Sequence, residues 1–280
     1  MAKVNNQTKA VSRRKLALVI GVGDYKYCKK LRNAENDANS MASTLERIGF
    51  IVTKKINSKH DEIETALLSF KQSIQKGDMI LFYFSGHGIQ WEDQNFLIPK
   101  EQADSDDNNF RCNMFSLNKL TNQVKDNDNI NYGNLKRYMI HVQKFVEDFS
   151  DRLPFVTICL LDCCRVYYFR NANLEQVSAR NVFSNTNKVN EFKIITNVGL
   201  VLGFACAAGA EADDNQKENH GLFTKHLLNH IIKPNKDILM ILRAVTGAVV
   251  EESKSKQIPH YTVSLSTEDN ICLCETDQGE

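Results

Sequence analysis

The feature that most constrains the fold of this 280-residue chain is the alternation of short apolar runs with stretches of helical period. Short β-branched runs bounded by glycine or polar residues predict buried strands, whereas apolar residues three and four positions apart predict amphipathic helices. The strand-like runs cover residues 16–22, 50–56, 79–84, 155–161 and 200–207. The helical patterns cover residues 34–48, 61–74, 221–232 and 237–252. Two later runs, 261–265 and 271–274, predict antiparallel strands.

Strands that are separated by helices imply right-handed crossovers, so the sequence predicts an α/β fold in which helices cover both faces of a mostly parallel sheet. We expect one domain over residues 15–275, preceded by a disordered tail over residues 1–14. Two polar segments, 101–133 and 166–193, interrupt the alternation. Loops of this length in a compact domain are usually functional or disordered.

The composition excludes several classes of protein. A net charge of +1 gives no overall attraction to nucleic acid or to an anionic membrane. No apolar run is long enough to span a bilayer, and the basic N-terminal residues are not followed by the apolar core of a signal peptide. The eight cysteines are irregularly spaced, which favours reduced thiols over a disulfide framework. We therefore expect a cytoplasmic protein that binds neither nucleic acid nor a membrane.

Two of the apolar runs end in chemically reactive residues. The run MILFYF leads into Ser85-Gly86-His87-Gly88, and the run VTICLL leads into Asp162-Cys163-Cys164. Ligands of an open parallel sheet bind beyond the carboxyl ends of its strands, so we expect His87 and Cys164 at one edge of the sheet. A histidine beside a cysteine can remove the thiol proton and create a thiolate nucleophile. Taken singly, each motif is equally compatible with a loop histidine or a buried thiol.

The glycines that flank His87 are typical of an active-site turn. Gly86 lets the chain turn sharply, and Gly88 leaves its backbone N–H unshielded beside the histidine. Backbone N–H groups of this kind stabilise the oxyanion that forms when a nucleophile attacks a carbonyl group. The N–H groups of Gly88 and Cys164 are therefore the candidate oxyanion donors.

The stretches YFSGHG and LLDCCR resemble the histidine and cysteine motifs of the caspase-like cysteine proteases of clan CD. Among these they are most similar to the paracaspases, the group that contains the MALT paracaspase. The resemblance extends over residues 15–266 and includes GFACAAGAEADD after the second motif. It implies a caspase-like three-layer α/β/α sandwich with an antiparallel C-terminal edge strand. It also implies a cysteine endopeptidase that uses a His87/Cys164 dyad and an acyl-enzyme intermediate, with no metal and no cofactor.

The resemblance also decides between the two adjacent thiols. Cys163 and Cys164 point to opposite sides after an extended strand, so only one of them can face His87. The family's Asp-x-Cys pattern assigns Cys164 as the nucleophile and leaves Cys163 as a packed residue. The chain departs from the classical caspases in lacking Q-A-C-x-G. It also separates His87 from Cys164 by 77 positions (164 − 87), more than the roughly 50 of that group.

Substrates with Arg or Lys before the scissile bond are a further implication of the resemblance. In paracaspases and metacaspases that basic side chain is held by carboxylates at three places, which match Asp37, Asp162 and Glu211. Clustered carboxylates suit a guanidinium, which makes paired hydrogen bonds with planar acids. Arg32 is a rival clue, because classical caspases cut after Asp and have an arginine in that neighbourhood. Its other interpretation is a solvated loop cation.

Two other functions remain open from the sequence. One is an inactive caspase-like scaffold, against which the presence of both His87 and Cys164 argues. The other is a calcium-dependent, metacaspase-like protease, although the acidic residues 104–107 lack the ligand positions of an EF-hand. Cys272 and Cys274 lack the spacing of a zinc site. Three histidines are assigned to one helix as surface or internally satisfied residues: His220, His226 and His230.

A possible partner is a second copy of the chain. Residues 261–265 have the alternating, β-branched character of an edge strand, and an exposed edge can pair with another chain. We expect a weak homodimer whose formation orders residues 166–193. The alternative is a stable monomer whose edge strand is covered by its own helix.

Overall fold

The computed structural model is built around one six-stranded sheet with the strand order β10-β9-β7-β3-β1-β2. It describes residues 13–26, 28–91, 94–100, 136–168, 199–210, 212–215, 218–265, 267 and 269–276. Five strands of the sheet are parallel, and β10 is antiparallel to its neighbour β9. Their bounds are β1 (Lys15–Gly21), β2 (Phe50–Ile56), β3 (Met79–Ser85), β7 (Val156–Asp162), β9 (Gly199–Phe204) and β10 (His260–Ser264). The predicted α/β class and the antiparallel edge strand are confirmed.

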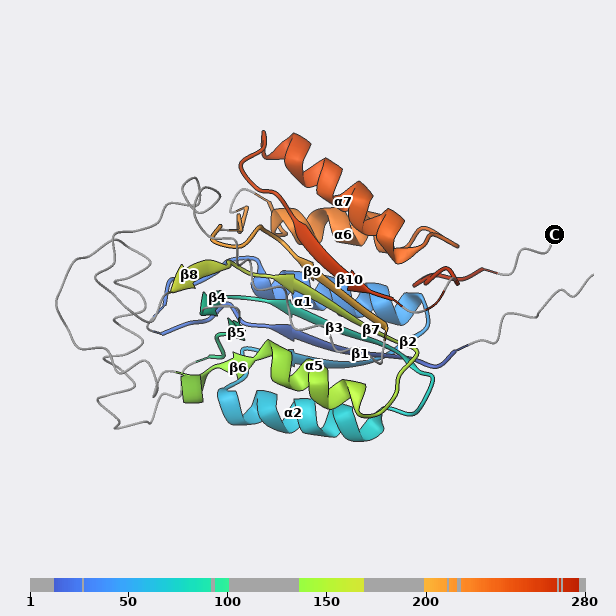
Figure 1. Cartoon of the computed structure of the whole chain (residues 1–280). Helices are drawn as coiled ribbons and strands as arrows, with labels where there is room; N and C mark the ends of the chain where they lie inside the picture. The colour runs from blue at the N-terminus through green and yellow to red at the C-terminus, as the bar shows by residue number, and fades with distance from the viewer. Residues whose placement is uncertain are drawn as a thin grey trace, which may run out of the picture.

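Helices cover both faces of this sheet and make the fold a three-layer sandwich (Figure 1). One layer contains α1 (Ala34–Arg47), α6 (Leu222–Ile231) and α7 (Ile238–Glu252). The opposite layer contains α2 (His60–Ser73) and α5 (Val142–Ser150). The helix over residues 142–150 lies outside the predicted set, whereas the other four helices agree with the predicted ranges to within one residue at each end.

The pleat of the central strands explains why two apolar layers form. Side chains alternate across a strand, so successive residues of β1 point to opposite faces. Leu18 and Ile20 pack with α2 and α5, whereas Ala17 and Val19 pack with α1, α6 and α7. A strand that is buried on both faces must be apolar at every position, which is the continuous pattern that the sequence shows.

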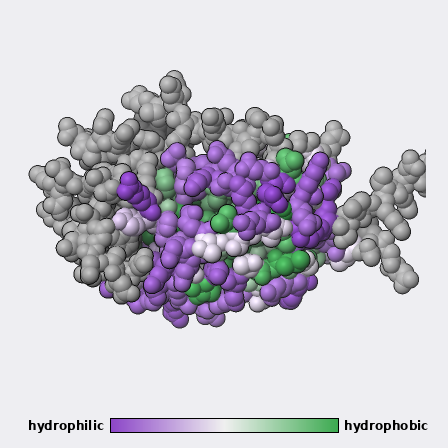
Figure 2. Space-filling view, turned by 90° about the horizontal axis from the view of Figure 1, so that it is seen from below, coloured by the Kyte–Doolittle hydropathy of each residue, from purple (hydrophilic) through white to green (hydrophobic). Residues whose placement is uncertain are grey.

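The outward surface of the α2 and α5 layer is mainly hydrophilic. Figure 2 looks onto this side, and its hydrophobic side chains lie in small separate groups among polar ones. Scattered exposed apolar residues of this kind are normal on a folded domain. Within the described residues, no helix has the length and apolar character that a bilayer-spanning segment requires.

A second, smaller sheet extends from the carboxyl ends of the central strands and was not predicted. Its strand order is β6-β5-β4-β8. The bounds are β4 (Gly88–Trp91), β5 (Gln94–Leu97), β6 (Ile140–His141) and β8 (Val166–Tyr168). The prediction of a loop from residue 166 is therefore wrong for its first three residues. The predicted strand at 271–274 is also wrong, because Cys272 makes only an isolated bridge with Asp237.

Several predictions fall outside the described residues. These concern residues 1–12 of the expected tail, the polar segment 101–133, and residues 169–193. Just before β1, the Arg14 guanidinium donates to both carboxylate oxygens of Asp78, at 3.0 and 2.6 Å. The ordered part of the chain therefore includes residues that directly precede the first strand.

Candidate active site

The two reactive motifs lie side by side at one end of the central sheet. In the pairing of β3 with β7, Ser85 is opposite Asp162, and His87 and Cys164 each follow that pair by two residues. The Gly86 N–H donates to the Asp162 carbonyl at 3.2 Å and fixes the two chain segments together. The strands that leave these segments, β4 and β8, also pair with each other. The structure therefore places His87 and Cys164 at the same edge of the sheet.

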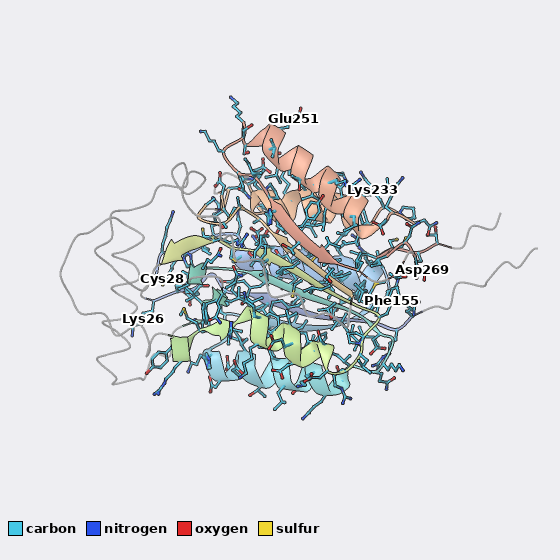
Figure 3. All side chains as sticks on the ribbon, in the orientation of Figure 1. Lys26, Cys28, Phe155, Lys233, Glu251 and Asp269 are labelled. Carbon is cyan, nitrogen blue, oxygen red and sulfur yellow. The ribbon has the colours of Figure 1, made fainter. Side chains whose placement is uncertain are left out.

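This end of the sheet lies on the side of Lys26 and Cys28, and Phe155 marks the opposite end (Figure 3). Lys26 and Cys28 belong to the loop after β1, whereas Phe155 directly precedes β7. The loops that follow β1, β3 and β7 therefore gather at one end, as expected for a site at the carboxyl ends of parallel strands.

Gly88 is the point of closest approach between the two motifs. A Cβ atom on Gly88 would lie 2.6 Å from the Cys163 Sγ and 3.0 Å from the Cys164 carbonyl oxygen. Any other residue would push β4 away from the cysteine segment, because real Cβ contacts are not this short. Glycine is thus required at residue 88 for packing.

The adjacent thiols have different environments. The Cys163 side chain is buried, and burial raises the pKa of its thiol well above the ordinary value. Cys164 is partly exposed, and its Sγ accepts a hydrogen bond from the Ala212 N–H at 3.4 Å. A buried thiol with a raised pKa is inert, whereas reactive cysteines are accessible to substrate. The burial of Cys163 and the exposure of Cys164 agree with the predicted distinction between them.

The ring of His87 is held by the loop that follows β1. Its Nε2 lies 2.7 Å from the Lys29 carbonyl oxygen, which can only accept, so Nε2 carries a proton. In the neutral ring, Nδ1 then has the lone pair and can act as a base. Tyr25 packs against the ring with centroids 4.6 Å apart, and its hydroxyl accepts from the His87 backbone N–H. Every residue has a backbone carbonyl, so no sequence pattern could predict the role of Lys29.

Two buried carboxylates lie next to this site. Asp37 of α1 and Asp162 at the end of β7 are 1% and 7% exposed. A Cβ atom on Gly221, directly before α6, would lie 3.1 Å from an oxygen of each acid, so the two carboxylates flank one glycine. The structure places Asp37 and Asp162 together, with Gly221 as the close-packed residue between them.

Hydrogen bonds from four residues hold the acid pair in place. Asp37 accepts from the Gly221 N–H at 3.2 and 3.3 Å, from the Ser85 hydroxyl at 3.2 Å, and from His220 at 3.0 Å. Asp162 accepts at its Oδ2 from the Thr224 N–H at 3.2 Å and from the Thr224 hydroxyl at 2.5 Å. The amino-terminal end of α6 therefore points its N–H groups at both acids, an arrangement that favours negative charge.

Burial nevertheless opposes ionisation of the pair. Desolvation raises the pKa of Asp37 to about 7, with a further contribution from the charge of Asp214. Desolvation and the neighbouring charge of Asp37 raise the pKa of Asp162 to about 7. Ionisation of both acids in one buried site costs much free energy unless a cation is present. The pair is thus an anionic site near neutral pH that would be stabilised by a positive ligand.

The third predicted acid of the pocket is Glu211, which lies outside the described residues. Asp214 accepts hydrogen bonds from the backbone N–H groups of Arg32 and Asn33, just before α1. Arg32 itself is exposed. His220 precedes α6 and contacts Asp37, so its predicted assignment to the helix is wrong, whereas His226 lies on α6 and contacts Glu252.

Metal-binding clusters are absent from the described residues. No group of three or more His, Cys, Asp or Glu side chains is arranged there to hold an ion. The acidic residues 104–107, considered above for calcium, lie outside the described residues.

Comparisons with known proteins identify the family. A family model of the caspase domain matches residues 14–270. The human mucosa-associated lymphoid tissue lymphoma translocation protein 1 is 24% identical over 257 residues, which cover 90% of this chain and 26% of the human protein. The mouse homolog is 23% identical over 268 residues, which cover 95% of this chain and 27% of the mouse protein. The chain thus spans about a quarter of the length of these curated relatives.

A solved structure shows the same fold. Caspase-1 from Spodoptera frugiperda has a TM-score of 0.62 at 14% identity, with 96% of this chain and 92% of that chain covered. This likeness agrees with the mostly parallel sheet and its antiparallel edge strand. The chain belongs to the caspase-domain family, and the paracaspases are its curated relatives.

Proposed function

We propose that this chain is a cysteine endopeptidase that cleaves peptide bonds after Arg or Lys. The observation that carries this proposal is the buried pair of Asp37 and Asp162 near the partly exposed thiol of Cys164. Asp162 is two residues before Cys164, so a side chain bound by the acid pair would bring its own carbonyl group close to the thiol. A guanidinium or an ammonium would supply the positive charge that the acid pair lacks.

The chemistry uses His87 and Cys164. Nδ1 of His87 takes the proton of the Cys164 thiol, and the thiolate attacks the carbonyl carbon of the basic residue. The N–H groups of Gly88 and Cys164 hold the resulting oxyanion. The imidazolium then gives its proton to the departing amine, and the C–N bond breaks to leave a thioester. Water, activated by His87, attacks the thioester and releases the carboxylate product and the thiol.

Lys29 has a positioning role in this scheme. Its carbonyl oxygen accepts from Nε2 of His87 and becomes more favourable as a partner when the ring is positively charged. This backbone group thus fixes the ring tautomer and stabilises the imidazolium. The carboxylate of a catalytic triad has the same role in other nucleophilic sites. Substitution of the Lys29 side chain should leave the interaction intact, because the contact is made by the main chain.

Peptide cleavage tests the proposal directly. A panel of matched peptides should carry Arg, Lys, citrulline or Asp before the scissile bond and be assayed with and without calcium. We expect cleavage after Arg and Lys only, independent of calcium. Cys164→Ala should abolish cleavage, whereas Cys163→Ala should retain most of it. Cleavage after Asp would refute the acidic pocket, and a requirement for calcium would favour a metacaspase-like enzyme. No cleavage in any condition would favour an inactive scaffold.

We also propose that the chain forms a weak homodimer through β10. This strand is at the edge of the central sheet, and an edge strand offers unpaired backbone groups to another chain. Analytical ultracentrifugation with and without an Arg-ending inhibitor should show a dimer that the inhibitor strengthens. A monomer in both conditions that is fully active at nanomolar concentration would contradict this.

A further inference from the structure

The acid pair contains one internal contact that the proposed chemistry does not use. His220 donates through its ring Nδ1 to Oδ1 of Asp37, at 3.0 Å. The other donors to Asp37 are the backbone of Gly221 and the hydroxyl of Ser85, a buried residue of β3. Those donors are fixed by the helix and the sheet. Among the described donors to Asp37, His220 is therefore the one whose side chain is partly exposed and can rotate into solvent.

The two acids differ in the acceptor positions that they offer to a ligand. Both oxygens of Asp37 accept hydrogen bonds, Oδ1 from His220 and Gly221 and Oδ2 from Ser85 and Gly221. Within the described residues, the hydrogen bonds of Asp162 all go to Oδ2. A cation could thus bind Oδ1 of Asp162 without displacing a donor. It could bind Asp37 only by taking the position of the His220 ring.

We propose that His220 is a specificity-determining residue of the proposed pocket, an internal occupant of Asp37 that a substrate's guanidinium or ammonium must displace. This inference rests on the proposed function, since it assigns the regulation of the same site. It goes beyond the expectation that His220 is a surface or internally satisfied histidine. The cost of displacing His220 then sets how strongly a basic residue binds relative to a neutral one.

The local chain allows this displacement. The side chain of His220 is 27% exposed, whereas that of Asp37 is 2% exposed, so the ring lies between the acid and the solvent. His220 stands outside α6, which begins at Leu222, and the preceding residues Glu218 and Asn219 are exposed. A rotation of the ring into water therefore breaks one hydrogen bond of the side chain without disturbing the helix.

Protonation of His220 would strengthen its competition with substrate. The charged groups that interact with its ring are Asp37 on α1, through the hydrogen bond, and Glu218 in the loop before α6. The charges of Asp162 and Asp214 act on the acid pair. Burial lowers the pKa of His220 from its ordinary value, so the ring is neutral at pH 8 and gains its charge only as the pH falls. An imidazolium adds the attraction of opposite charges to the hydrogen bond that a neutral ring makes with a carboxylate.

Two substitutions at residue 220 and one matched control test the inference. His220→Ala removes the occupant, and His220→Asn keeps a neutral donor. His226→Asn is the control, because His226 lies on α6 but contacts Glu252 instead of the acid pair. We expect His220→Ala to lower KM for an Arg peptide about 3- to 10-fold at pH 6 and about 2-fold at pH 8, with kcat little changed. His220→Asn should lose most of the pH-dependent part, and His226→Asn should match the wild type.

A raised KM in both variants, in proteins with an unchanged melting temperature, would overturn the inference and make His220 a support for Asp37. A melting curve of each variant separates this result from misfolding. If a variant is destabilised, the second measurement below decides.

Binding measured without turnover separates this inference from the proposed function. Cys164→Ala protein can be titrated with N-acetyl-arginine amide while the ring nitrogen signals of His220 are followed by NMR. The inference predicts that these signals move to solvent-like values as the ligand binds, and that His220→Ala increases the affinity. Cation binding that leaves His220 on Asp37, or no cation binding at all, would overturn it. Binding with displacement in a protein that cleaves no peptide would refute the proposed function alone.

Discussion

Two acidic sites of the molecule, Asp24 and the pair of Asp37 and Asp162, have opposite character. Asp24, in the loop after β1, is half-exposed and contacts Lys30 and Lys100 at 2.6 Å each. Hydrogen bonds from Lys100 and then Lys30 lower the pKa of Asp24 to about 2. Asp37 and Asp162 are buried, and burial raises the pKa of each to about 7. Within the described residues, His220 is the basic side chain that contacts this pair, through Asp37.

This difference shows which site is built for a ligand. Asp24 has its counter-charges supplied by the chain and gains little from another cation, since exposed ion pairs are weak and screened. The buried pair carries a desolvation cost that only a further positive group could offset. Acids with strongly perturbed pKa values in a pocket are candidates for function. Variants of Asp162 and Asp24 should therefore differ in activity and in stability.

Removal of one buried carboxylate should have the largest effect. Asp162→Asn takes away a charge from a desolvated cation site, which costs on the order of 2–5 kcal/mol of transition-state binding. We therefore expect kcat/KM for an Arg peptide to fall by about 30-fold or more. Asp24→Asn is the matched control, with an expected change of about twofold or less. Equal losses in the two variants would show that the buried pair has no special part in substrate binding.

Activity toward basic substrates should depend on pH through the same pair. The pair must be ionised to hold a cation, and its pKa values of about 7 mean that it gains protons below neutrality. The ratio of kcat/KM for Arg and citrulline peptides should fall by up to about tenfold per pH unit below pH 7. This ratio removes the titration of His87 and Cys164, which act on both substrates. A ratio that stays constant from pH 5 to 8 would contradict the assignment.

Thermal stability should show the smallest effect, and its sign distinguishes the two sites. A buried acid with a raised pKa stabilises the fold below its ordinary pKa and loses that contribution as pH rises through about 7. Asp24, with a lowered pKa, contributes above its ordinary value and loses its contribution as pH falls through about 2. Asp162→Asn should thus raise the melting temperature at pH 8 by about 2–5 °C. Calorimetry at pH 8 and pH 5 checks this, and Asp24→Asn should give no such rise.

The main sheet could be predicted because its strands are buried on both faces and so read as unbroken apolar runs. The small sheet was missed because its strands are only two to four residues long and mix polar with apolar positions, as in GIQW and QNFL. Such strands form because the ends of β3 and β7 bring their backbones together, which is a tertiary effect. Residues 271–274 have a strand-like pattern but pair only through Cys272.

The residues of the candidate site likewise fall into those that the sequence predicts and those that it does not. The side chains of His87, Cys164 and Asp162 were found because they follow strand-like runs that end at one edge. Lys29 acts through its main chain, and His220 is a single polar residue that meets Asp37 across 183 positions of sequence. Neither contact leaves a local pattern. The raised pKa values also depend on burial by α6, which no residue of the motifs reveals.

Proton release on cation binding tests the central claim, that the buried acid pair receives a basic side chain. Cys164→Ala protein should be titrated calorimetrically at pH 6.5 with matched peptides that end in Arg or citrulline, in two buffers of different ionisation enthalpy. We expect the Arg peptide to bind at least about 10-fold more tightly than the citrulline peptide. We also expect release of about 0.5–1 proton per peptide, because the pair must lose its proton to hold the cation. Equal binding of the two peptides, with no proton released, would contradict the claim.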